Sequence, residues 1–190
     1  MLEIFLDMDG VLADLRRQMY TSWSTNEYDA FDGPYPFMKG GAKEEPFEQW
    51  YGAKERWTTG PVLNPEFWEM IPQYPWSQSL YFQARQLGNV HICSNPGRPE
   101  FARSAAYGKM AWCASELRLK PAHVILMRDK YLLARSNRIL IDDDEDNITK
   151  WREHGGTGIL FPQPWNKARQ FVSDDQVAYC MNILNGEEHA

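Results

Sequence analysis

Residues 7–14 have the sequence Asp-Met-Asp-Gly-Val-Leu-Ala-Asp and directly follow the mostly apolar residues 2–6. The apolar run predicts a short buried strand that Gly10 ends. Side chains two apart share one face of an extended chain, so Asp7 and Asp9 are expected to point together from the carboxyl end of this strand. Two carboxylates crowded there repel unless a cation lies between them, and a hard divalent ion such as Mg²⁺ is the simplest choice. Taken alone, however, the stretch fits a solvated turn after a strand better than a metal site.

Three later segments put polar side chains at the ends of further predicted strands. Asn89–Ser94 predicts a strand that ends in a serine, and the apolar run Val124–Met127 is followed by Arg128–Lys130 in a short helix-like segment. Arg138–Ile141 predicts another buried strand, which leads into the acidic residues 142–146. Parallel strands joined by helices bring all such ends to one edge of the sheet. One point could therefore collect a metal, phosphate-binding groups and a nucleophile.

In this order, the segments resemble the four signature motifs of the haloacid dehalogenase (HAD) superfamily of phosphohydrolases. A closer likeness is to the 5′(3′)-deoxyribonucleotidases and their phage and bacterial relatives. The matching strings are Phe5–Asp14, Ile92–Pro96, Lys109–Trp112, Ile125–Lys130, Leu140–Asp143 and Leu160-Phe161 with Asn166 beyond. The resemblance implies an α/β fold with a Rossmann-like parallel sheet and a small helical cap inserted after the first strand.

The order of motifs also suggests a division of chemical roles. A carboxylate can attack phosphorus and form an aspartyl-phosphate, and the resemblance assigns this role to Asp7. Asp9 would protonate the leaving alkoxide and later deprotonate the attacking water. Ser94, with Asn95 and nearby backbone N–H groups, would hold phosphate oxygens, and Lys130 would supply positive charge.

Lys109 is placed beside the substrate phosphate by the resemblance, but a solvated helix lysine fits the sequence equally well. The expected helix around it covers Glu100–Leu117.

The predicted metal site draws on the first and last acidic clusters. The candidate ligands are Asp7, Asp9 through its backbone carbonyl as the resemblance implies, Asp143 and Asp142. Adjacent strand residues face opposite ways, so the last two can rarely both contact one ion; the family pattern favours Asp143 as the direct ligand. The acids at 144–146 precede a predicted helix and are expected mainly to favour its N-terminus.

Residues 15–76 are rich in aromatic side chains and are expected to form the helical cap, whereas residues 1–14 and 77–190 form the core. Aromatic rings suit a pocket that stacks a nucleobase, although most of them are expected to pack in the cap itself. Phe67 and Trp68 are the exceptions that we expect to touch the base, because this stretch resembles an aromatic pair of the nucleotidases. At the other end of the chain, Ser173 is expected to cap a final helix that Asn185-Gly186 ends.

Composition bounds the class of protein. The chain has 190 residues, of which 43% are hydrophobic and 24% charged, as is usual for a single globular domain with an insertion. The net charge of −6 argues against a surface that coats nucleic acid, and no apolar run approaches the length of a membrane span. Three cysteines without CxxC spacing fit a reducing compartment with buried thiols, so a cytoplasmic location is expected. The four histidines are scattered and give no support for a zinc site.

The sequence therefore predicts Mg²⁺-dependent hydrolysis of a nucleoside monophosphate, with deoxyribonucleotides favoured. Two alternatives stay open: a phosphatase for another small organophosphate or a polynucleotide 3′-phosphate, and a catalytically silent domain that binds a nucleotide or a protein. The preferred base, the 5′ or 3′ position and the oligomeric state, monomer or homodimer, are not determined at this stage.

Overall fold

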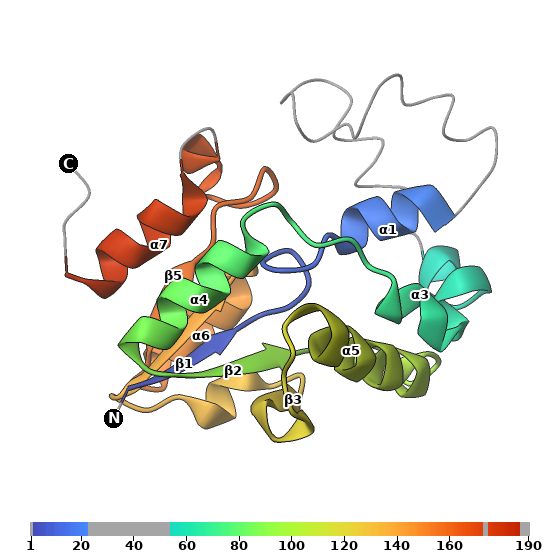
Figure 1. Cartoon of the computed structure of the whole chain (residues 1–190), viewed down its shortest axis with the longest axis horizontal. Helices are drawn as coiled ribbons and strands as arrows, with labels where there is room; N and C mark the ends of the chain where they lie inside the picture. Colours follow the sequence, from blue (N-terminus) through green and yellow to red (C-terminus); the bar gives the residue numbers. More distant parts are fainter. Residues whose placement is uncertain (1, 23–53, 173–174, 187–190) are drawn as a thin grey trace.

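The computed structural model describes residues 2–22, 54–172 and 175–186. Its core is one parallel five-stranded sheet in the order β3-β2-β1-β4-β5, with the first strand of the chain in the centre (Figure 1). The strands are β1 (Glu3–Leu6), β2 (Asn89–Ser94), β3 (Val124–Leu126), β4 (Arg138–Asp142) and β5 (Thr157–Leu160). Each predicted strand is present, and its bounds lie within one residue of the apolar run that predicted it.

Side chains of the central strand β1 point alternately to the two faces of the sheet, and they belong to two separate hydrophobic clusters. Ile4 and Leu6 belong to the larger cluster, which contains buried side chains of α4 (Ser77–Leu87), α5 (Ala102–Glu116) and α7 (Gln176–Leu184). Phe5 belongs to the smaller cluster with α6 (Glu145–Glu153). Successive side chains of a strand point to opposite faces, so helices cover both faces of this sheet. The prediction of a Rossmann-like α/β fold is confirmed.

The described part of the long insertion packs against this core. It contains α1 (Leu15–Ser22), the 3₁₀ turns η3 (Lys54–Trp57) and η4 (Gly60–Leu63), and the short helix α3 (Pro65–Glu69). Val62 and Trp68 are buried in the same hydrophobic cluster as the sheet. Gly108 of α5 lies so close to α3 that a Cβ there would collide with the backbone of Pro65. The predicted cap over residues 15–76 stays a prediction, because much of it, with Trp23, Tyr28 and Trp50, lies outside the described residues.

Capping residues account for two differences from the expected helices. Asp175 caps α7: its side chain accepts hydrogen bonds from the backbone N–H groups of Val177 and Ala178. Ser173, the expected cap, lies outside the described residues. Helix α6 is expected to begin at Asn147 but begins at Glu145. Asp144 is the N-cap of this helix, because its side chain accepts a hydrogen bond from the backbone N–H of Asn147. The expectation that residues 144–146 serve the start of this helix is therefore confirmed.

Three further 3₁₀ turns complete the described chain: η5 (Pro121–His123), η6 (Lys130–Leu133) and η7 (Arg169–Phe171). All three cysteines are free and buried, as predicted. Among the helices of the described residues, none has both the length and the apolar character that a membrane crossing requires.

Candidate active site

The candidate site lies at the carboxyl edge of the sheet, where three neighbouring strands end. In the parallel register, Leu6 pairs with both Ile92 and Ile141. The backbone N–H of Asp7 continues this pairing by donating to the carbonyl of Ile141 at 2.9 Å. The next residues of all three strands therefore reach the same edge, which brings the first acidic motif, Ser94 and the last acidic cluster together. Ligands of open α/β sheets bind at this edge.

Lys130 connects the first and last acidic motifs. Its Nζ atom lies 2.8 Å from Oδ1 of Asp7 and 2.7 Å from Oδ2 of Asp142, and all three side chains are buried. Burial by itself would lower the pKa of Lys130, but the two carboxylates outweigh it and raise the pKa above its ordinary value. The lysine therefore stays charged, and it is held at the end of the central strand.

Lys109 forms a second buried cationic centre, which contacts the other acid of the first motif. It is 2% exposed, and its Nζ atom donates to the Asp9 carboxylate, to Ser94 Oγ at 2.9 Å and to the Asn95 carbonyl at 2.7 Å. The alternative that it is a solvated helix lysine is wrong. The Trp68 ring lies 5.2 Å from the same Nζ atom.

The two acids of the first motif contact different lysines. Asp7 contacts Lys130, and Asp9 contacts Lys109. The charge of Asp9 nevertheless contributes to the raised pKa of Asp7. Oδ1 of Asp9 is buried, and no protein group in the described structure satisfies it.

Asp7, Asp142 and Asp143 form the acidic cluster that could hold a metal. Each offers a carboxylate oxygen, and these oxygens all lie within 4.8 Å of one another. Burial raises the pKa of Asp7, and the charge of Lys130 lowers it. The charges of Asp142 and Asp9 raise it further, and the result is a pKa of about 7. Burial and the charges of Asp142 and Asp7 also raise the pKa of Asp143 well above its usual value. A divalent cation would relieve this repulsion, so the carboxylates fit a hard ion such as Mg²⁺.

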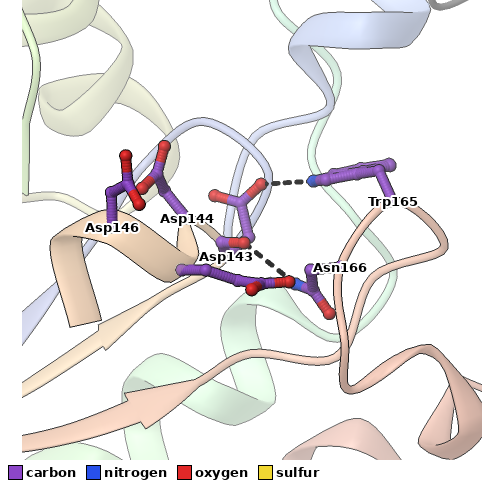
Figure 2. A pocket seen from close by; sticks show the side chains of 6 residues that line it. Asp143, Asp144, Asp146, Trp165 and Asn166 are labelled. Carbon is purple, nitrogen blue, oxygen red and sulfur yellow. Dashed lines mark hydrogen bonds between the residues drawn. The ribbon is translucent and has the colours of Figure 1, made fainter. Parts of the chain in front are cut away.

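The two adjacent acids of the last motif have different partners. Asp142 accepts hydrogen bonds from Lys130, from Asn147 Nδ2 at 3.1 Å and from the backbone N–H of Asp144 at 2.9 Å. Asp143 accepts from the indole Nε1 of Trp165 at 2.7 Å through Oδ2 (Figure 2).

The loop after β5 supplies contacts that the sequence analysis missed. Besides Trp165, Gln163 donates to the carbonyl of Gly10, and Asn166 donates to the Asp143 carbonyl at 2.9 Å. Asn166 was already among the matching strings, but no spacing or periodicity points from the other two side chains to the acidic motifs. A hollow of about 240 Å³ lies beside this loop (Figure 2). It is lined by Asp143, Asp144, Glu145, Asp146, Trp165 and Asn166.

Phe67 and Trp68 are almost completely buried, with 5% and 1% of their surfaces exposed. Trp68 donates its indole N–H to the carbonyl of Val62 at 2.8 Å and stacks on Phe101. These contacts favour a role in the core. Contact of either ring with a substrate base stays a prediction.

Solved structures similar to this fold are HAD-type hydrolases, although their sequences are distant. A HAD family hydrolase from Deinococcus radiodurans R1, determined with bound phosphate and sodium, has 16% identity and a TM-score of 0.51, with 97% of this chain and 95% of that chain covered. A haloacid dehalogenase-like protein from Streptococcus pneumoniae has 13% identity and a TM-score of 0.51, with 96% and 98% covered. CbbY from Rhodobacter sphaeroides, in complex with xylulose-(1,5)bisphosphate, has 15% identity and the same TM-score, with 92% of each chain covered. These likenesses establish the fold.

The family follows from the sequence match. No curated protein sequence matches the chain. The family model described as "5′ nucleotidase, deoxy (pyrimidine), cytosolic type C protein" matches residues 1–178 and so includes every strand and both buried lysines of the site. The chain therefore belongs to this family of 5′-nucleotidases, and it is a phosphatase of the HAD type.

Proposed function

We propose that the protein hydrolyses nucleoside monophosphates, with deoxyribonucleotides favoured, in a Mg²⁺-dependent reaction through an aspartyl-phosphate on Asp7. The observation that carries the proposal is the convergence of Asp7, Ser94, Lys109 and Lys130 at one sheet edge beside the acidic cluster. Phosphoryl transfer needs an in-line nucleophile and positive charge around the equatorial oxygens, and these residues supply both.

In the proposed reaction, an Asp7 carboxylate oxygen attacks phosphorus, and the bond between phosphorus and the ester oxygen breaks. Asp9 donates a proton to the departing alkoxide. Asp9 then takes a proton from a water molecule that attacks the aspartyl-phosphate, which releases inorganic phosphate and restores Asp7. The contact of Asp9 with Lys109 supports this role, because it keeps the carboxylate beside Ser94, a proposed phosphate ligand.

The lysines and the serine would hold the phosphate. Lys109 already contacts the Ser94 hydroxyl and the Asn95 carbonyl, so its ammonium group and the hydroxyl lie together at the end of β2. Lys130 supplies positive charge through its contact with Asp7. Because the whole chain has a net charge of −6, these two buried cations and the metal must reverse the field locally for an anionic substrate.

Mg²⁺ would be held by Asp7 and Asp143, with the backbone carbonyl of Asp9 as a further ligand, and would neutralise charge on the phosphate when bound. Asp142 would position neighbouring groups and would not bind the metal directly, since its oxygens already accept hydrogen bonds from Lys130, Asn147 and a backbone N–H. The cofactor, the cytoplasmic location and the small-molecule partner are parts of the same proposal. The family description, which names a cytosolic nucleotidase, supports the location and the partner, and the acidic cluster supports the cofactor.

The decisive experiment compares the wild type with Asp7→Asn. Phosphate release is measured on a panel of ribo- and deoxyribonucleoside monophosphates, together with sugar phosphates, first with Mg²⁺ and then with EDTA. We expect the wild type to prefer deoxyribonucleotides, and both EDTA and the substitution to abolish release. Undiminished release by Asp7→Asn would rule out the covalent mechanism. Faster hydrolysis of sugar phosphates than of every nucleotide would overturn the substrate assignment.

A further inference from the structure

The loop that follows β5 contacts the metal-site motifs through three of its side chains. Gln163 donates to the Gly10 carbonyl, in the turn that follows Asp9. Asn166 donates to the carbonyls of Asp143 and Phe161, at 2.9 and 2.8 Å. Trp165 alone among them contacts a carboxylate, at 2.7 Å from Oδ2 of Asp143 (Figure 2). Backbone contacts hold the loop in place, and the indole acts on the proposed metal ligand itself.

The Asp143 carboxylate needs such a contact to keep one orientation. The carboxylate lies among acids, since it offers an oxygen within 4.8 Å of carboxylate oxygens of Asp7 and Asp142. Rotation about its side-chain bonds would carry its oxygens out of the cluster. An indole N–H is a donor only, so it favours the orientation in which a carboxylate oxygen, here Oδ2, accepts its hydrogen bond.

The indole ring is itself fixed from the other side. The guanidinium carbon of Arg16, on α1, lies 3.8 Å from the centre of the Trp165 ring. A guanidinium stacked on an indole face is a favourable cation–π contact. The first residues of the insertion, the loop after β5 and the last acidic motif thus meet at one indole.

We infer that Trp165 is a positioning residue for the metal site: its Nε1–H orients the Asp143 carboxylate for Mg²⁺. The inference rests on the proposed function, because it takes Asp143 as a metal ligand. Groups that orient metal ligands typically change metal affinity about 10–100-fold when they are removed. Loss of the indole N–H should therefore weaken Mg²⁺ binding by about tenfold without preventing folding.

The test is a calorimetric titration at pH 8, which measures the Kd of each metal-free protein for Mg²⁺ alone. Trp165→Phe keeps a ring but removes the donor. Trp165→His keeps a ring N–H, because imidazole Nε2 can occupy the place of indole Nε1, and a neutral imidazole is expected at this pH. Trp76→Phe is the matched control: Trp76 is also half-buried, and its Nε1 donates at 2.9 Å, but to the backbone carbonyl of Val11.

We expect about a tenfold higher Kd for Trp165→Phe, and a Kd near the wild-type value for both Trp165→His and the control. Thermal unfolding in EDTA checks that each variant folds; if Trp165→Phe does not, Trp165→Leu takes its place with the same expected loss. Equal Kd values for the wild type and the donor-free variant would overturn the inference and leave the proposed function intact. Failure of the wild type to bind Mg²⁺ would overturn both.

Discussion

Two buried lysines are the residues on which the charge balance of the site depends. Lys109 and Lys130 are 2% and 1% exposed, and each contacts a carboxylate of the first motif. A buried ammonium group is costly unless it is paired, and removal of one partner leaves an uncompensated charge. The lysines therefore make the acidic motif compatible with burial before any metal or substrate binds.

Lys109→Met is expected to lower kcat by about 10²- to 10³-fold, the usual effect of losing one group that stabilises transition-state charge. The substitution removes the ammonium group from Asp9, Ser94 and Asn95 together. Steady-state phosphate release measures the effect. Lys150→Met, at an exposed position of α6, is the control and should retain wild-type kcat. A kcat for Lys109→Met within a few-fold of the control would contradict a role in catalysis.

Gly10 occupies a position that requires glycine for two reasons. Its φ of +82° lies in the left-handed region, and a Cβ atom there would collide with the Asp143 carboxylate. A left-handed backbone alone costs a non-glycine residue about 1–2 kcal/mol. Because of the added collision, Gly10→Ala should lower the free energy of unfolding by more than this amount. Gly155→Ala is the matched control, with a φ of +86° and nothing within 4 Å of the added Cβ. Urea unfolding of both variants measures the difference, and equal losses would show that the collision is relieved at no cost.

At the scale of elements, capping side chains determine where two helices begin. One is α6, beside the site, and the other is α7, on a face of the sheet. Asp144 begins α6 next to the acidic cluster, and Asp175 begins α7, which buries Val177, Cys180 and Met181 against the larger hydrophobic cluster. An unpaired N–H in the first turn of a helix is satisfied by such side chains.

Asp175→Ala should lower the free energy of unfolding by about 1 kcal/mol, because two backbone N–H groups lose their acceptor. Asp129→Ala provides the comparison. Asp129 also precedes a helical turn, η6, but its side chain makes no capping hydrogen bond there. Its loss should cost less than about 0.5 kcal/mol in chemical unfolding. A smaller effect for Asp175→Ala than for Asp129→Ala would show that the cap of α7 contributes little.

For the whole molecule, the acidic cluster couples folding to pH and to metal. The pKa of Asp7 is raised from 3.8 to about 7 in the folded protein, so the folded state binds more protons than the unfolded state between these values. Stability without metal should therefore fall as the pH rises from about 4 to about 7. Mg²⁺ that binds only the folded protein should offset this loss at the upper end of the range.

Unfolding free energies measured across this pH range, in EDTA and in excess Mg²⁺, check the coupling. Asp7→Asn, which cannot ionise, should flatten the profile in EDTA and reduce the stabilisation by Mg²⁺. A wild-type profile in EDTA that rises steadily from pH 4 to pH 7 would contradict the raised pKa of Asp7.

Much of this architecture was predictable because it depends on local patterns. The apolar runs that predicted strands correspond to β1, β2, β3 and β4, since a strand buried on both faces needs an almost continuous apolar sequence. The rule that parallel strand ends meet at one edge then brought Asp7, Ser94, Lys130 and the last acidic motif together, as the structure confirms. The capping of α6 by its own acids followed from the same local chemistry.

Tertiary packing decided which charged group faces which partner. Asp9 contacts Lys109, which lies 100 residues further along the chain. The contact of Trp165 with Asp143 joins a loop to a strand end, and no periodicity in either segment encodes it. Hydrophobic alternation and strand order depend on neighbours along the chain and on simple topology, whereas the pairing of side chains depends on distances that exist only after the helices have packed on the sheet.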